Sequence, residues 1–360
     1  MEAYEYQNQA KRTERINWEN EHGSDIAILG AIGEVGTLAS VIKKHQRDGD
    51  SYASFNDDFI EELGDVLWYV MTIASRLSIP FNEWPTTIIK FSSTFDGVFK
   101  LYDDVTALYK KKDSLVGPSS AYNSGSKIII TEIFNDLNSL ARLANTTLSD
   151  IAKQSCDKNL AYWSNFNNAP ARVFDANFPK YEQLPRQCSI DVISIDEKTI
   201  ILKMNDVAIG DRLTDNSYME DGYRFHDVFH LAGVVTLGWS PVFRRMLKLK
   251  RKSDPKTDEI QDGARAAIVE EAVINHIYDY ARSTSNFLEG MTRIDLDLIN
   301  RIQNLVRGYE VESCEPWEWQ DCILKGYELF RLLNKQKNGR LILDANKRTL
   351  TLQKLPQDLD

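Results

Sequence analysis

Cysteine is scarce in this chain of 360 residues. The wide spacing of Cys156, Cys188, Cys314 and Cys322, with no CxxC pair, excludes a zinc ribbon and a disulfide framework and predicts a reduced, cytoplasmic compartment. The sequence also lacks an uninterrupted apolar run of about 18 residues, so we expect no membrane span. The N-terminal stretch, MEAYEYQNQAKRTERINWENEHG, is polar and mixed in charge, which predicts that it is not a secretory signal.

An excess of positive charge is missing as well. Lysine and arginine number 43 against 53 aspartate and glutamate, and the net charge of −10 argues against a general nucleic-acid-binding protein. It leaves room for a local basic pocket that binds a small anion. Low-complexity tracts are absent, and 42% apolar and 27% charged residues are ordinary for a globular protein. The length favours two domains.

Helical periodicity dominates both halves of the chain. In the first half it predicts helices over residues 24–49, from 59 to near Pro80, and over 127–147 and 148–163, with a loop at 117–126. The β-branched stretch CSIDVISIDEKTIILKMNDVAIGD predicts a hairpin or short sheet. Helices are expected again over residues 223–237, 241–249, 262–283, 295–307 and 316–335. We therefore expect an all-α fold class, with a helical domain at 1–163, a connector with a short β segment at 164–222, and a second helical domain at 223–360.

Three carboxylates crowd one level of the apolar helix that contains FIEELGDVLW. Glu62 and Asp65 are three residues apart, and Glu61 precedes Asp65 by one turn, so all three can reach the same region. Glu34 is the one acidic residue in ILGAIGEVGTLAS, and antiparallel packing of the two helices would bring it to that region. Carboxylates that meet without a cation repel one another, whereas all-oxygen ligation favours Mg²⁺ or Mn²⁺. The alternative is that they pair with lysine or arginine, or lie on a wet edge.

The first half resembles the MazG-like nucleoside triphosphate pyrophosphohydrolases. The segments YQNQAKRT, GEVGTLASVIKK, FIEELGDVLWYV and CDKNLAYW follow one another in that family's order, within residues 4–163. The resemblance implies an all-α domain that holds magnesium on an ExxE…ExxD carboxylate set. It also implies cleavage of an NTP or dNTP to the monophosphate and pyrophosphate. It is associated with nucleotide-pool housekeeping or with nucleotide depletion in antiphage defence.

Carried over position by position, the resemblance assigns metal binding to Glu34, Glu62 and Asp65, and catalysis to these three with Glu61. Thr37 stands where the family has its second glutamate. This departure could weaken metal binding, leave the position to Glu61 or water, or mark a domain that no longer catalyses. Lys158 and Asn159 match family positions near the triphosphate. The cluster Lys43, Lys44 and Arg47 is a further candidate for phosphate binding, or else a charged helix end.

Histidines supply a second candidate site in the other half. His226 and His230 are spaced i, i+4 in YRFHDVFHLAGVV, next to Asp227, and AIVEEAVINHIYDY offers Glu270 and Glu271. Two histidines with carboxylates suit manganese, iron or zinc, so a transition-metal site is one interpretation and packed core histidines are the other. The basic segment between them, residues 244–252, suits phosphate or nucleic acid, or is a solvated loop. Residues 206–283 also look like the C-terminal extension of a long subgroup of MazG-like proteins.

Three functions remain open at this stage. The first is a magnesium-dependent nucleotide pyrophosphohydrolase, and the second is a catalytically impaired nucleotide sensor that acts through a protein partner. The third is a metal-dependent phosphohydrolase with its site in the histidine-rich half. A weak internal repeat aligns residues 61–74 with 131–144 and matches Glu62 to Glu132. Because helix pairs of this size need apolar cover, we also expect a homo-oligomer, a dimer or tetramer.

Overall fold

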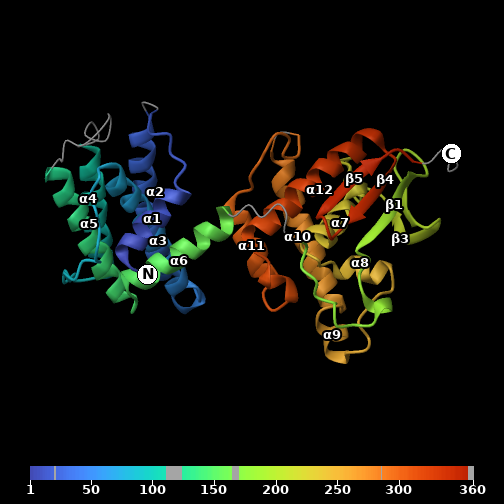
Figure 1. Ribbon diagram of the computed structural model, residues 1–360, viewed down its shortest axis with the longest axis horizontal. Coiled ribbons are helices and arrows are strands. Elements are labelled where there is room, and N and C mark those ends of the chain that lie inside the picture. Colours follow the sequence, from blue (N-terminus) through green and yellow to red (C-terminus); the bar gives the residue numbers. More distant parts are fainter. Residues whose placement is uncertain (20–21, 111–123, 164–169, 285, 356–360) are drawn as a thin grey trace. The chain divides into compact units, whose positions relative to one another are not determined.

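The computed structural model describes residues 1–19, 22–110, 124–163, 170–284 and 286–355 (Figure 1). Most of the predicted loop at 117–126 lies outside these ranges. Backbone contacts divide the chain into two compact units, Met1–Trp163 and Ser164–Asp360.

The N-terminal unit is a bundle of helices. They are α1 (Ala3–Thr13), α2 (Gly23–Asp48), α3 (Phe55–Arg76), α4 (Thr94–Tyr109), α5 (Ser124–Leu143) and α6 (Leu148–Trp163). Helix α2 packs along α3, and α4 packs along α5 (Figure 1). The apolar stripe predicted on α3 is buried at Phe59, Leu63, Val66, Leu67 and Val70. This stripe packs into one continuous hydrophobic core of the unit.

Small residues set how closely these helices approach. A Cβ at Gly30 of α2 would lie 2.2 Å from the Tyr69 ring of α3, so only glycine fits there. Glu34 and Asp65 each lie four residues from this contact on their own helix, hence on the same faces. On the other side of α3, the Ser155 hydroxyl of α6 donates to the Gly64 carbonyl at 3.3 Å. These two approaches bring α2, α3 and α6 together around one set of polar side chains.

Helix α2 and the turn after it, Gly23–Ser51, are long and apolar enough to cross a membrane by length and composition alone. The core helix of a globular protein can have the same length and the same apolar composition. Here Ile28, Ala31, Val35 and Leu38 are buried in the core of the unit.

The C-terminal unit contains a five-stranded antiparallel sheet. Its strands are β1 (Gln187–Ser194), β2 (Ile200–Met204), β3 (Val207–Leu213), β4 (Gly339–Asp344) and β5 (Thr349–Gln353), in the order β3-β2-β1-β4-β5. The hairpin expected in residues 188–211 is confirmed by the β1–β2 pairing, with Val192 opposite Leu202. The all-α expectation is wrong for this unit, because β1 also pairs with β4, with Ile190 opposite Leu341. The β1–β3 segment thus belongs to the same unit as the helices that follow it.

The helices of this unit are α7 (Asp227–Thr236), α8 (Pro241–Met246), α9 (Pro255–Ile260), α10 (Ala264–Arg282), α11 (Leu296–Leu305) and α12 (Pro316–Gln336). Three short 3-10 turns, Lys180–Glu182, Tyr223–Phe225 and Glu310–Ser313, accompany them. Helix α12 packs along α7, and both contact β5 (Figure 1). Their shared core includes Phe229, Tyr327 and Phe330, all buried.

The basic segment at 244–252 is only partly solvated. Arg244 and Arg251 are 2% and 1% exposed. Arg251 donates to both oxygens of Asp262 and to Glu310, and Arg244 donates to Asp175. These two guanidinium groups therefore connect the turns around α8 and α9, while Lys248 and Lys252 are exposed. The solvated-loop interpretation is wrong for the two arginines.

Candidate functional site

Three carboxylates from two helices meet in the N-terminal unit. Glu34 lies on α2, and Glu62 and Asp65 lie on α3. One ligand oxygen from each lies within 4.8 Å of the other two, and all three side chains are half-buried. Glu61 occupies the same turn of α3, with 40% of its side chain exposed. The structure thus brings together the acidic residues that the sequence singled out.

A lysine from α6 enters this carboxylate cluster. Lys158 Nζ lies 2.6 Å and 2.7 Å from the two oxygens of Asp65, and 3.2 Å from Glu61 Oε1. Burial disfavours its charged form, but the two carboxylates outweigh burial and raise the pKa of Lys158. The alternative of pairing with a basic residue is therefore realised in part, with one ammonium group among Glu34, Glu61, Glu62 and Asp65.

One ammonium group does not balance the charge of these acids. Burial, followed by repulsion from Asp65, Glu34 and Glu61, raises the pKa of Glu62 to about 8. Near neutral pH, Glu62 consequently holds a proton in much of the population when no cation is bound. An all-oxygen cluster with this surplus of negative charge fits a hard divalent cation.

The surface beside Glu34 is open. Within the described part of the chain, nothing outside the local helix lies within 4 Å of a Cβ built at Gly33 or Gly36. Thr37 is exposed, and its hydroxyl donates to the Gly33 carbonyl at 3.2 Å. Thr37 is not in the carboxylate cluster, so this position supplies no charge to it.

The predicted phosphate-binding residues divide into two groups. Lys158 lies inside the carboxylate cluster, and Asn159 follows it on α6, half-buried. On α2, Lys44 Nζ lies 3.7 Å from the centre of the Tyr52 ring, and Arg47 binds Asp48 through two hydrogen bonds. Lys43 is exposed. Lys44 and Arg47 thus have local contacts at the end of their helix.

The C-terminal unit contains a second cluster, at the start of α7. One ligand atom from each of His226, Asp227 and His230 lies within 4.8 Å of the other two, and all three residues are buried. Glu271 joins them from α10, with its oxygens 3.4 Å from His230 Nε2 and 3.9 Å from His226 Nε2. The i, i+4 histidine spacing therefore does place both rings against the predicted glutamate pair.

The two neighbouring glutamates have different positions. Glu270 Oε1 lies 2.7 Å from His230 Nδ1, behind the ring, and its other oxygen accepts from the Val242 backbone N–H at 2.8 Å. Burial lowers the pKa of His230, but Glu270, Glu271 and Asp227 together raise it well above its ordinary value. Sequence spacing did not distinguish Glu270 from Glu271, because adjacent helical residues lie about 100° apart and only the packing of α10 shows which faces which nitrogen.

Tyr223 is a residue of this site that the sequence analysis missed. Its carbonyl lies 2.8 Å from His226 Nδ1, and its ring stacks on the His226 ring at 4.3 Å between centres. The aromatic residue three positions before a histidine, in YRFH, is the only sequence signal for it.

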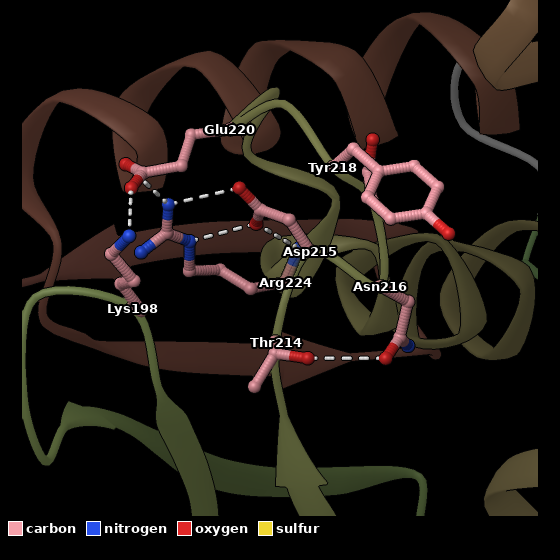
Figure 2. Close-up of a pocket in the computed structure, with 8 residues that line it drawn as sticks. Lys198, Thr214, Asp215, Asn216, Tyr218, Glu220 and Arg224 are labelled. Atoms are coloured by element: carbon pink, nitrogen blue, oxygen red, sulfur yellow. Dashed lines mark hydrogen bonds and ion pairs between the residues drawn. The ribbon is translucent and has the colours of Figure 1, made fainter.

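The segment before Tyr223 forms an open pocket of about 710 Å³, which the sequence did not predict (Figure 2). It is lined by Lys198, Thr214, Asp215, Asn216, Ser217, Tyr218, Glu220 and Arg224. Figure 2 shows the Arg224 guanidinium between Asp215 and Glu220, with Lys198 beside Arg224 and also paired with Glu220. Asp215 also accepts the backbone N–H groups of Gly222 and Arg224. This buried ion pair therefore fixes the turn that presents Tyr223 and His226.

Comparison with known proteins identifies the C-terminal unit. A protein named Gene 37 protein, of Mycobacterium phage L5, is 37% identical over 68 residues, which cover 18% of this chain and 56% of that protein. No solved structure matches the chain. Residues 169–356 match the family described as the MazG C-terminal domain; this range contains the sheet and the histidine cluster and lies beyond the segment 4–163. Because this match covers just over half of the sequence, the chain belongs to the MazG C-terminal domain family.

Proposed function

We propose that the N-terminal unit hydrolyses a nucleoside triphosphate or deoxynucleoside triphosphate to the monophosphate and pyrophosphate. In this proposal Glu34, Glu62 and Asp65 hold a magnesium or manganese ion. The observation that carries it is the convergence of their oxygens within 4.8 Å. Membership of a MazG family supports a nucleotide as the substrate class. The resemblance of residues 4–163 to MazG-like pyrophosphohydrolases supports the reaction type.

In this proposal the carboxylates of the cluster bind the cation and Lys158 binds a substrate phosphate. A divalent cation bound there supplies positive charge to the phosphates and Lewis-acid activation of water. Glu34, Glu62 and Asp65 each offer an oxygen, and Glu62 must lose its proton to do so. Lys158 has a flexible four-carbon stem, so its ammonium group can exchange the oxygens of Asp65 for those of a phosphate. The ammonium group would then balance part of the phosphate charge as substrate enters.

The proton of the attacking water needs an acceptor. Glu61 is suited to this role, because it lies beside the cluster, bonds Lys158 and has 40% of its side chain exposed. The water oxygen forms a bond to the α-phosphorus, and the bond from that phosphorus to the α–β bridging oxygen breaks. Pyrophosphate leaves with the electron pair, and Glu61 receives the proton.

A second candidate is a nucleotide sensor that binds without turnover. Two observations favour it: Lys158 contacts both oxygens of Asp65, and Thr37 contributes no carboxylate. In this case the ammonium group would take the place of the cation. The nucleotide would act by changing contacts of α6 rather than by being cleaved.

The test measures product formation by the full chain with a panel of NTPs and dNTPs, in Mg²⁺ and in Mn²⁺. We expect pyrophosphate rather than phosphate, and at least about a 100-fold loss of turnover in Glu62→Gln and in Asp65→Asn, as for removal of a metal ligand. Glu132→Gln is the matched control, since Glu132 is exposed on α5 and corresponds to Glu62 in the internal repeat.

The outcomes separate the alternatives. Unchanged turnover in both variants would exclude the carboxylate cluster as the active site. Release of phosphate in place of pyrophosphate would exclude the pyrophosphohydrolase reaction. Saturable nucleotide binding with no product from any nucleotide would favour the sensor.

A further inference from the structure

In the histidine cluster of the C-terminal unit, hydrogen bonds fix which ring nitrogen donates and which one faces the cluster. His226 ends the 3-10 turn before α7, and His230 lies one helical turn later. His226 Nδ1 lies 2.8 Å from the Tyr223 carbonyl oxygen, which can only accept a hydrogen bond. That contact places a hydrogen on Nδ1 of His226. In the neutral ring, Nε2 then carries the lone pair.

His230 repeats this arrangement. Its Nδ1 lies 2.7 Å from Glu270 Oε1, so this nitrogen also donates. Glu270 is 4% exposed, and its second oxygen is fixed by the Val242 N–H. A carboxylate or carbonyl behind the ring, with the other nitrogen pointing forward, is the arrangement that orients histidines as metal ligands.

The two Nε2 atoms face the same pair of carboxylates. Asp227 Oδ1 lies 3.3 Å from His226 Nε2 and 3.9 Å from His230 Nε2. Glu271 approaches the same two nitrogens from α10, at 3.9 Å and 3.4 Å. Each carboxylate is therefore shared by both imidazole rings, as expected for groups that surround a common centre.

The buried ring of His230 directs its Nε2 atom into this cluster. His230 is 1% exposed, and its Nε2 makes no hydrogen bond of good geometry among the described residues, although a Glu271 oxygen lies 3.4 Å away. Buried polar atoms without a hydrogen bond are rare in folded proteins, and a bound water or ion is one explanation for such an atom. This nitrogen points towards the carboxylates of Asp227 and Glu271 at distances that an inserted ion would bridge.

We propose that His226, Asp227, His230 and Glu271 bind a divalent transition-metal ion, and that Glu270 and the Tyr223 carbonyl are positioning groups. Two imidazole nitrogens suit zinc, iron or manganese better than magnesium. The proposal assigns a ligand to the C-terminal unit and does not depend on the activity proposed for the N-terminal unit.

Glu271 is the most exposed of the four side chains in this cluster. The Glu271 side chain is 44% exposed, whereas those of His226 and Asp227 are 9% and 11% exposed. An ion would therefore enter past Glu271, and any further ligand, such as water or a phosphate oxygen, would bind on that side. Such access is characteristic of metal centres that keep a coordination position open.

The test uses Co²⁺ as a spectroscopic probe and Zn²⁺ as a competitor. The full chain carries Glu62→Gln and Asp65→Asn, so that the N-terminal carboxylates do not contribute. We expect about one equivalent of Co²⁺ per chain with visible d–d absorption, removed by Zn²⁺. His226→Gln and Glu271→Gln should each weaken binding at least tenfold and change the spectrum. Glu270→Gln should weaken it about 10- to 100-fold with His226 still coordinated.

His276→Gln is the matched control, because His276 lies on α10 beyond both clusters found in the described residues. It should leave the affinity and the spectrum unchanged. Circular dichroism of each variant separates loss of binding from loss of folding. Absence of Co²⁺ and Zn²⁺ binding by the folded parent would overturn the proposal, and so would an unchanged spectrum in folded His226→Gln. Either result would mean that the cluster is a buried ion-pair network alone.

Discussion

Lys158 and Asp65 form a two-point contact, in which Nζ lies 2.6 Å and 2.7 Å from the two carboxylate oxygens. This contact places an ammonium group against Asp65, while Glu62 three residues earlier has its pKa raised to about 8 by burial and by repulsion from its carboxylate neighbours. The lysine therefore neutralises one side of the carboxylate cluster and leaves the other side short of positive charge. Four predictions follow from this pair and from other buried charges.

The first concerns Lys158 itself. In Lys158→Met, the Asp65 carboxylate loses its ammonium contact, so binding of Mg²⁺ should be kept or strengthened. Pyrophosphate release should fall at least about tenfold, because one charge-assisted phosphate contact is lost. Isothermal titration with Mg²⁺ and a turnover assay separate the two effects. Lys153→Met, an exposed lysine on the same helix, is the control. A parallel loss of Mg²⁺ affinity and turnover would contradict the exchange of Lys158 from Asp65 to phosphate.

The second concerns pH. Without a cation, Glu62 has a pKa of about 8, and coordination requires its ionised form. Below that pH each bound Mg²⁺ must displace a proton, so the apparent affinity should rise about tenfold per pH unit and level off above about pH 8. Titrations from about pH 6 to 9, in buffers of different ionisation enthalpy, measure both affinity and proton release. Glu62→Gln should remove the slope, and a slope that persists in this variant would assign the proton elsewhere.

The third concerns the stability of the N-terminal unit. Asp136 on α5 is buried 3.7 Å from Lys100 Nζ, and burial raises its pKa to about 7 despite that lysine. Because the pKa of Asp136 in the folded protein lies above its ordinary value of 3.8, its stabilising effect is full below about pH 4 and is lost as pH rises through about 7.

Asp136→Asn should therefore stabilise the unit at pH 8 by about 2 kcal/mol and change it little near pH 4. Thermal unfolding monitored by circular dichroism at both pH values measures the difference. Asp157→Asn, at an exposed position of α6, is the control. Equal effects at the two pH values would show that Asp136 does not titrate in this range.

The fourth concerns the buried ion pair between Arg251 and Asp262 in the C-terminal unit. Arg251 donates to both oxygens of Asp262, and the two side chains are 1% and 0% exposed. Asp262→Asn removes the buried one of the two carboxylates that bind the Arg251 guanidinium, the other being Glu310, which should cost about 3 kcal/mol of unfolding free energy. Urea unfolding followed by tryptophan fluorescence measures this loss, with Lys252→Met as the exposed control. The double variant Arg251→Met/Asp262→Leu should recover part of the lost unfolding free energy. A loss in the double variant equal to the sum of the losses in the two single variants would argue against the ion pair between Arg251 and Asp262.

The spacing of residue types within single helices and strands accounts for much of what the sequence predicted. The apolar stripe of α3 and the isolated Glu34 on α2 predicted which carboxylates meet, because helical periodicity fixes which side chains share a face. The hairpin β1–β2 followed from β-branched runs around a short polar turn. The i, i+4 spacing likewise placed His226 and His230 together on one face.

Contacts between distant segments account for what the sequence did not predict. Strands β4 and β5 are short, and GRLILDANKRTLTLQ becomes a strand pair only against β1, far away in the chain. The family resemblance places Lys158 near the triphosphate, and residue spacing cannot show that α6 also places its ammonium group on Asp65. The burial of Arg244 and Arg251 was missed for the same reason, since their counter-ions Asp175 and Asp262 lie in separate turns.

Strand β1 is central because β4, which lies far from it in the sequence, covers one of its edges, through pairs such as Cys188 with Leu343. Until β4 has been made and has paired with it, that edge of β1 is open to any other extended backbone. Nascent or truncated chains that stop before Gly339 would offer it for intermolecular β-pairing. The β4–β5 hairpin therefore protects this edge of β1 from pairing with another chain.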